Sequence, residues 1–144
     1  MSNSLSKVTK TAGRKILVVD DQVDAAETLA MLLRLEGHEV EVAHSGNDAL
    51  AAIAAFNPSM VFLDIGLPDM NGYEVGKQIR QRTPSAEVFL VALTGYGEAE
   101  DRQLSADAGF DYHLVKPATL AALNEILKLQ RGLKAPSAKA KNRD

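Results

Sequence analysis

Residues 60–64 read Met-Val-Phe-Leu-Asp, a short and wholly apolar run that ends in an aspartate. Residues 16–21 have the same arrangement, because Ile-Leu-Val-Val is followed there by Asp20 and Asp21. A strand covered by helices on both faces has this uninterrupted apolar pattern, whereas a strand with one wet face alternates. The two runs therefore predict two buried strands of a parallel sheet.

Three carboxylates follow these two strands directly, since Asp20 and Asp21 close one run and Asp64 closes the other. Ligands of a parallel sheet collect at the carboxyl ends of its strands. Carboxylates gathered there repel one another strongly unless a divalent cation joins them. We therefore predict a metal-dependent acidic pocket at this edge of the sheet.

Length and composition are those of one compact globular domain, with 144 residues of which 46% are hydrophobic and 24% are charged. The chain contains no cysteine, which excludes disulfides and thiolate metal sites. No apolar stretch approaches the roughly 18 residues needed to span a membrane. Residues 1–13 also lack the apolar segment of a signal peptide. We therefore predict a cytoplasmic location without membrane contact.

Charge is distributed unevenly along the chain. Each end carries three positive charges in excess, in residues 1–14 and 132–144, so that a formal net charge of −3 leaves −9 for the residues between them. Both ends are polar and lack hydrophobic periodicity, which predicts flexible basic extensions on either side of a domain over residues 15–131. The acidic body argues against direct nucleic-acid binding.

Strand and helix patterns alternate five times between about Lys15 and Arg131, and helix start and stop signals separate them. Asp24 is expected to cap the first helix, Gly37 to end it, and Ser45 to open the second helix. We expect strands at residues 16–19, 39–43, 60–64, 88–93 and 112–115. The last helix should bury leucines at helical spacing, namely Leu120, Leu123 and Leu127.

A βα unit repeated five times with right-handed crossovers gives an α/β fold, a doubly wound parallel sheet with helices on both faces. Side chains from remote parts of the chain then end strands on the same rim of that sheet, and these are Asp20, Asp21, Asp64, Thr94 and Lys116. Taken singly, each has a structural explanation as a cap, a turn residue or a solvated charge. Their convergence on one rim favours a functional site.

Four motifs along the chain resemble the receiver domain of two-component response regulators. They are Val-Asp-Asp at 19–21, Leu-Asp-Ile-Gly-Leu-Pro-Asp-Met-Asn-Gly at 63–72, Ala-Leu-Thr-Gly at 92–95 and Val-Lys-Pro at 115–117. Each motif is weak by itself, but the set is specific, and the resemblance covers residues 15–131. It implies a flavodoxin-like five-stranded sheet of order 2-1-3-4-5 with five helices.

The resemblance further implies that Asp64 is the phosphoacceptor of a phosphorelay. It also implies that Lys116 and Thr94 contact the phosphoryl oxygens. The backbone carbonyl of Gly66 would be a ligand of a metal ion. Asp20, Asp21 and Asp64 match the few carboxylates and several waters that octahedral Mg²⁺ prefers, with Mn²⁺ as an alternative. Charge neutralisation and positioning are what phosphoryl transfer to a carboxylate needs most.

His113 lies three residues before Lys116, where receivers commonly carry an aromatic ring that switches rotamer. An imidazole is a departure from the usual Tyr or Phe, and its unperturbed pKa of about 6.5 would make such a switch weakly pH-sensitive. A histidine without a signalling role is the competing reading. His38 and His44 flank the second strand, far along the chain from the acidic set, and are expected to be surface residues. The three histidines show no metal-ligand spacing, so a zinc site is not expected.

The implied partners are a sensor histidine kinase or histidine phosphotransfer protein upstream and a protein target downstream. Output could arise from partner binding, from onward relay to a histidine, or from a larger parent protein, with the domain a monomer or a phosphorylation-dependent dimer. The chain is expected to be a switch with only self-directed phosphotransfer and autodephosphorylation, not an enzyme in the usual sense.

Two other classes compete with this interpretation. A haloacid-dehalogenase-like phosphatase would carry Asp-x-Asp after the first strand, whereas this chain has Asp20-Asp21-Gln22. A phosphate-independent module of receiver shape would lack at least one member of the set formed by the acidic pair, Asp64 and Lys116. This chain has the whole set. Glycine-rich nucleotide-binding motifs do not follow the first strand.

Overall fold

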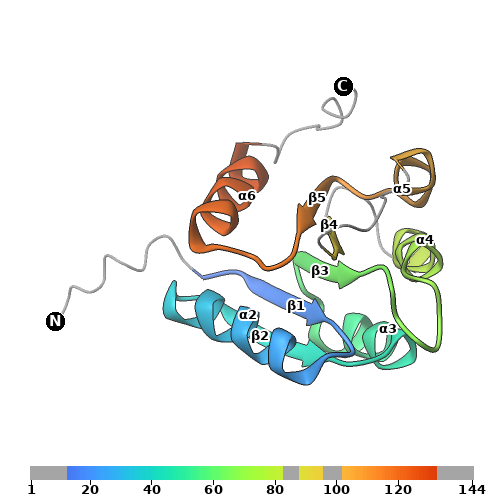
Figure 1. Cartoon of the computed structure of the whole chain (residues 1–144), viewed down its shortest axis with the longest axis horizontal. Coiled ribbons are helices and arrows are strands. Elements are labelled where there is room, and N and C mark those ends of the chain that lie inside the picture. The colour runs from blue at the N-terminus through green and yellow to red at the C-terminus, as the bar shows by residue number, and fades with distance from the viewer. Residues whose placement is uncertain (1–12, 83–87, 96–101, 133–144) are drawn as a thin grey trace, which may run out of the picture.

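Five strands and five helices alternate along the chain in a computed structural model that describes residues 13–82, 88–95 and 102–132 (Figure 1). The strands are β1 (Lys15–Val19), β2 (Glu39–Ala43), β3 (Met60–Asp64), β4 (Phe89–Thr94) and β5 (Tyr112–Val115). The helices are α2 (Val23–Leu35), α3 (Gly46–Phe56), α4 (Gly72–Arg82), α5 (Arg102–Ala108) and α6 (Leu120–Gly132). The alternation predicted from the apolar runs is confirmed.

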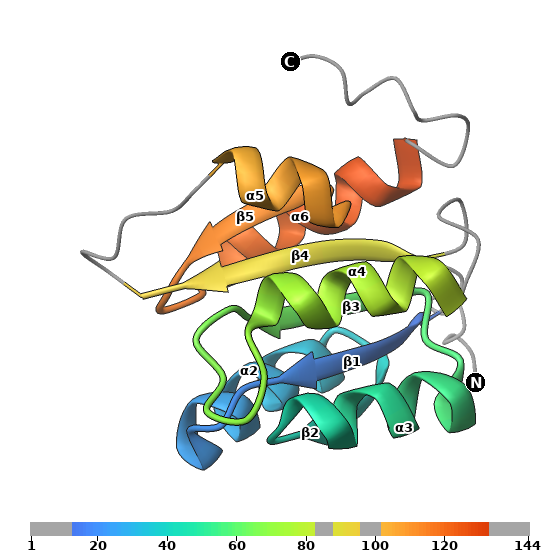
Figure 2. The same cartoon turned by 90° about the vertical axis from the view of Figure 1, so that its right-hand side faces the viewer.

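The strands form one parallel sheet in the order β2-β1-β3-β4-β5, which confirms the predicted doubly wound topology. All strand arrowheads visible in Figure 2 point the same way. β1 and β3 are neighbours, with Val19 paired to Leu63, and β3 in turn pairs with β4. The carboxyl ends of β1, β3 and β4 therefore meet at one rim.

Side chains alternate along each buried strand between two apolar clusters, one on each face of the sheet. On β1, Ile16 and Val18 pack with α2 and α6, while Leu17 and Val19 pack with α3 and α4. Figures 1 and 2 show α2 and α6 on one side of the sheet and α3, α4 and α5 on the other. β3 and β4 are apolar up to their last residues, Asp64 and Thr94, because both faces of these strands are covered.

Helix ends follow the predicted chemistry at α3 but not at the start of α2. The Ser45 hydroxyl accepts a hydrogen bond from the amide of Asp48, as a capping residue does. The prediction that Asp24 caps α2 is wrong, because the N-cap is Gln22 and Asp24 lies in the first turn. Gly37 ends α2 with a φ of 95°, a conformation that glycine adopts without a steric penalty.

The last helix buries part of the predicted stripe. Leu123, Ile126 and Leu127 are buried, whereas Leu120 is 43% exposed, so its place on the buried face was wrongly predicted. The predicted extensions lie outside the described residues except for residues 13, 14 and 132. Across the described part of the chain, no helix combines the length and apolar character needed to span a membrane.

Candidate functional site

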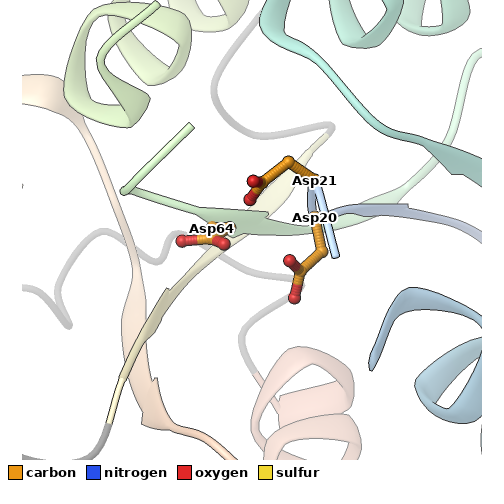
Figure 3. A group of neighbouring side chains, drawn as sticks. All are labelled: Asp20, Asp21 and Asp64. Atoms are coloured by element: carbon orange, nitrogen blue, oxygen red, sulfur yellow. The ribbon is translucent and has the colours of Figure 1, made fainter. Parts of the chain in front are cut away.

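The ends of β1 and β3 bring three carboxylates together at one rim of the sheet. Each of Asp20, Asp21 and Asp64 offers an oxygen, and these three oxygens all lie within 4.8 Å of one another (Figure 3). The pairing of Val19 with Leu63 places the residues that follow them side by side. Asp20 and Asp64 are buried, while Asp21 is exposed and opens the cluster to solvent. The predicted acidic pocket is therefore present.

Lys116 bridges the two buried carboxylates. Its Nζ donates to Oδ2 of Asp20 and to Oδ2 of Asp64, each at 3.2 Å. Its backbone amide donates to the carbonyl of Thr94 at 2.7 Å, which fixes the segment after β5 against the end of β4. The peptide bond that follows, Lys116–Pro117, is cis. The lysine predicted from the Val-Lys-Pro motif thus reaches the site from a different strand.

Backbone amides satisfy the remaining oxygens of the two buried carboxylates. Oδ1 of Asp20 accepts from the amide of Gln22 at 3.0 Å, and Oδ1 of Asp64 accepts from the amide of Gly66 at 2.8 Å. Each bond spans two residues, the local geometry that Asp favours in turns. Each carboxylate thereby has one oxygen held by its own loop and the other turned toward Lys116.

The charges of the pocket shift the pKa values of two of its members. Burial raises the pKa of the Asp20 carboxyl above its usual value, and the nearby charge of Asp64 adds to this against the opposing hydrogen bond from Gln22. Burial lowers the pKa of Lys116, but the charges of Asp64 and Asp20 outweigh it, so the pKa of Lys116 is raised overall. The site holds more negative charge than one lysine balances.

The donor set fits a hard divalent cation. Three carboxylates converge, and one side of the cluster faces water, as Mg²⁺ prefers when it keeps part of its hydration shell. Asp20, Asp21 and Asp64 are the side chains that would hold the ion. The metal role predicted for the Gly66 carbonyl stays a prediction, although its amide contact with Asp64 puts this loop at the pocket.

The two predicted switch residues lie on adjacent strands. Thr94 is buried at the end of β4, where it pairs with Val115 of β5. His113 is half-buried on β5, and its Nε2 lies 2.7 Å from the hydroxyl of the buried Ser105 on α5. Thr94 is thus next to the pocket, and His113 faces α5 farther along the sheet. Their coupling stays a prediction.

Two polar residues near the pocket were not predicted to belong to it. His44 was expected to be a surface residue far along the chain from the acidic set, and in the structure its Nδ1 lies 3.0 Å from the carbonyl oxygen of Asp20. Asp69, in the loop between β3 and α4, accepts from the amides of Gly46 and Asn47. His38 accepts from the amide of Arg14, and both histidines are half-buried, so the prediction of surface residues is met only in part. The sequence signal at Asp69 was limited to the neighbouring Pro68 and Gly72, which indicate a tight turn.

A doubly wound parallel sheet with three aspartates and a lysine at its carboxyl rim defines a class of phosphate-handling acidic site. The model of the response regulator receiver domain family matches residues 16–128. The chain therefore belongs to the response regulator receiver domain family. It acts in phosphorelay signalling of the two-component type, as a phosphoacceptor switch rather than a catalytic enzyme, and receiver domains partner with histidine kinases.

Similar proteins differ in how far they extend beyond this domain. The chain is 39% identical over 105 residues to the probable transcriptional regulatory protein TcrX of Mycobacterium tuberculosis. The aligned region covers 73% of this chain but only 44% of TcrX. It is 35% identical to an uncharacterised 14.6 kDa protein of Leptolyngbya boryana, covering 71% of the chain and 78% of that protein. The chain thus spans less than half of one relative and most of another.

Solved structures give the same fold. The crystal structure of a CheY-like response regulator receiver domain protein from Methanospirillum hungatei superposes with a TM-score of 0.77 at 30% identity. The match covers 85% of this chain and 97% of that one. The five-stranded order and the helical layers are therefore those of a receiver domain.

Proposed function

We propose that Asp64 accepts a phosphoryl group from a phosphohistidine of a sensor histidine kinase or a histidine phosphotransfer protein, with Mg²⁺ held by Asp20, Asp21 and Asp64. One observation carries this proposal: Oδ2 of Asp64 lies 3.2 Å from Nζ of Lys116 inside a cluster of three carboxylates. A buried carboxylate that faces a fixed cation and two further acids is arranged for charge-neutralised chemistry.

The transfer exchanges one phosphorus bond for another. A carboxylate oxygen of Asp64 attacks the phosphorus, the P–N bond to the donor imidazole breaks, and the imidazole nitrogen leaves with the bonding electron pair. In this proposal Lys116 contacts the oxygens of the arriving group, which its Nζ, 3.2 Å from Oδ2 of Asp64, supports. The amide of Gly66 holds the other carboxylate oxygen. Bound Mg²⁺ would neutralise negative charge where an anionic phosphoryl group meets three carboxylates.

Loss of the phosphoryl group returns the switch to its starting state. Water attacks the phosphorus of the acyl phosphate, and the Asp64 carboxylate leaves with the electron pair of the P–O bond. The pocket can admit water on the side of Asp21, which is exposed. This slow self-directed hydrolysis is the only turnover that we assign to the domain.

Phosphorylation is read out through Thr94 and, by the same proposal, His113. A phosphoryl group biases a conformational equilibrium only through contacts that differ between the two states. Thr94 follows Leu93, the residue of β4 that pairs with Asp64, and β5 with His113 is the neighbouring strand, so we assign this contact to the Thr94 hydroxyl. Thr94→Ala should therefore still be phosphorylated but should lose the phosphate-dependent change in partner affinity.

Intact-mass spectrometry tests the proposal. The protein is incubated with acetyl phosphate with and without Mg²⁺, next to Asp64→Asn and to Asp24→Asn as a control at an exposed aspartate of α2. Wild type and Asp24→Asn should gain the mass of one phosphoryl group only with Mg²⁺, and Asp64→Asn should gain none. Mg²⁺-independent labelling, or labelling of Asp64→Asn, would contradict the proposal.

A further inference from the structure

The carbonyl of Asp20 is held by a residue that the metal site does not use. Nδ1 of His44 lies 3.0 Å from this oxygen, and because a carbonyl oxygen can only accept, Nδ1 must carry the proton. The amide of Asp20 donates to the carbonyl of Ala43 at 3.1 Å. Both backbone polar groups of this pocket residue are thus fixed by two consecutive residues at the end of β2.

The same segment holds the loop that follows Asp64. The amide of Gly46 donates to Oδ1 of Asp69 at 2.8 Å, and the amide of Asn47 donates to Oδ2 at 3.2 Å. The hydrogen bond from Gly46 keeps the pKa of the Asp69 carboxyl below its usual value, so this side chain is ionised at neutral pH. A carboxylate on the first two amides of α3 is also stabilised by the helix dipole.

Packing reinforces this polar contact. Gly46 is buried, and a Cβ added there would lie 2.9 Å from Cβ of Met70 and 3.1 Å from Cγ2 of Val75. The loop after β3 therefore rests directly on the backbone at the start of α3. The β2–α3 junction thus contacts two segments that are remote in sequence, the end of β1 at Asp20 and the β3–α4 loop at Asp69, with 24 positions separating His44 from Asp20 and 23 separating Gly46 from Asp69.

We propose that three residues of the β2–α3 junction, His44, Gly46 and Asn47, form a positioning element that sets the separation between the acidic pair and the Asp64 loop and so tunes affinity for the divalent cation. This inference rests on the proposed Mg²⁺ function of the pocket. Groups behind the direct ligands typically change metal affinity about 10–100-fold when removed, because they fix ligand orientation. His44 acts through Asp20, and the Gly46 and Asn47 amides act through Asp69.

His44 is tested with a matched pair of variants. His44→Asn keeps a donor, because the Asn side-chain nitrogen occupies the place of Nδ1, whereas His44→Leu keeps a similar shape without the donor. Isothermal titration with Mg²⁺ should give about 10-fold weaker binding for His44→Leu and near-wild-type binding for His44→Asn. Equal affinity of His44→Leu and wild type, or equal losses in both variants, would overturn the role of His44.

Asp69 is tested against a capping residue of the same helix. The Ser45 hydroxyl accepts the amide of Asp48 within α3, so Ser45→Ala weakens the helix end without removing the bonds to the loop. Asp69→Ala and Ser45→Ala should both lower the urea midpoint, but only Asp69→Ala should weaken Mg²⁺ binding, by about 10-fold. Equal Mg²⁺ affinities in these two variants would overturn the proposal.

Mg²⁺ binding by the wild type distinguishes a failure of the proposed pocket from a failure of the proposed junction. If wild type binds no Mg²⁺ in the titration, the proposed function of the pocket fails. If wild type binds Mg²⁺ and the four variants bind it equally well, the pocket stands and only the positioning role of the junction fails.

Discussion

The acidic pocket and the amino end of α3 lie at the same rim of the sheet, yet they treat aspartate in opposite ways. In the pocket, Asp20 is buried beside Asp64 and its pKa is raised. At α3, the exposed Asp69 accepts two backbone amides and its pKa is lowered. A carboxylate matched to amides stabilises its own loop, whereas carboxylates crowded together create a demand for a cation.

Lys116 meets this demand only in part. It contacts Asp20 and Asp64 but leaves the cluster with more acids than cations among the described side chains of the pocket. Asp69 needs no cation, because its amide partners are permanent parts of the fold. Asp69 therefore has a structural role, whereas the pocket aspartates are suited to bind a cation. The following variants test this difference in role.

The largest expected effect is on cation binding by Asp20→Asn. Removing a direct ligand should weaken Mg²⁺ binding by about 100-fold, the upper end of the range seen for supporting groups. Isothermal titration measures it, with Asp24→Asn as the exposed control. Near-wild-type affinity in Asp20→Asn would place the cation elsewhere on the protein.

Lys116→Met should destabilise the protein when Mg²⁺ is absent, because two buried carboxylates lose their shared cation. Since the lysine side chain is 24% exposed, we expect a loss of about 2 kcal/mol in the free energy of unfolding, below the value for a fully buried pair. Urea unfolding with and without Mg²⁺ measures it, with Lys128→Met at an exposed position of α6 as control. Added Mg²⁺ should stabilise Lys116→Met more than wild type. An equal increase in both would contradict the view that Lys116 and Mg²⁺ neutralise the same carboxylates.

Asp69→Ala should destabilise the protein whether or not Mg²⁺ is present. Loss of a helix-capping carboxylate should lower the midpoint of thermal unfolding by roughly 3–6 °C. Differential scanning calorimetry at neutral pH checks this value against Ser45→Ala, which removes one capping bond instead of two. A larger loss in Ser45→Ala than in Asp69→Ala would show that the loop contact contributes little.

The smallest expected effect, and the sharpest in sign, is on the pH dependence of stability without Mg²⁺. The folded pKa of Asp20 lies above the usual aspartate value of 3.8, so native wild type binds the proton more tightly than the unfolded chain does. Wild type should therefore lose stability relative to Asp20→Asn as pH rises from 3.8 through the raised pKa.

Asp69→Ala should show the opposite trend. The folded pKa of Asp69 lies below 3.8, so its contribution is present above that pH and is lost as pH falls through the folded pKa. Urea unfolding across the acid range measures both differences from wild type. Trends of the same sign in the two variants would contradict the contrast between the pocket and the helix end.

Much of this molecule was predictable because its signals are local. The runs at residues 16–19 and 60–63 are apolar throughout, and only a sheet covered on both faces buries every position. Parallel pairing then brings Asp20 and Asp64 to one rim without further information. Lys116 was predictable only through its motif, since nothing in a lone lysine indicates that it reaches two carboxylates.

The residues that were missed depend on contacts between segments without periodicity. His44 follows an edge strand and looks like a surface residue until the carbonyl of Asp20 is placed beside it. Asp69 has turn-forming neighbours, but its partners, the amides at the start of α3, carry no side-chain signal. The cap of α2 was wrongly assigned to Asp24 because the actual N-cap, Gln22, makes no side-chain capping hydrogen bond that a sequence pattern could indicate.

The central claim is that Asp64, among the aspartates of this rim, is the one that becomes phosphorylated. Borohydride reduces an acyl phosphate of aspartate to homoserine, so protein treated with acetyl phosphate and Mg²⁺, then reduced and digested, reports the modified position by peptide mass spectrometry. We predict homoserine at position 64 and unmodified aspartate at positions 20, 21 and 69. Homoserine at any of those three positions, or at none of the four, would contradict the account.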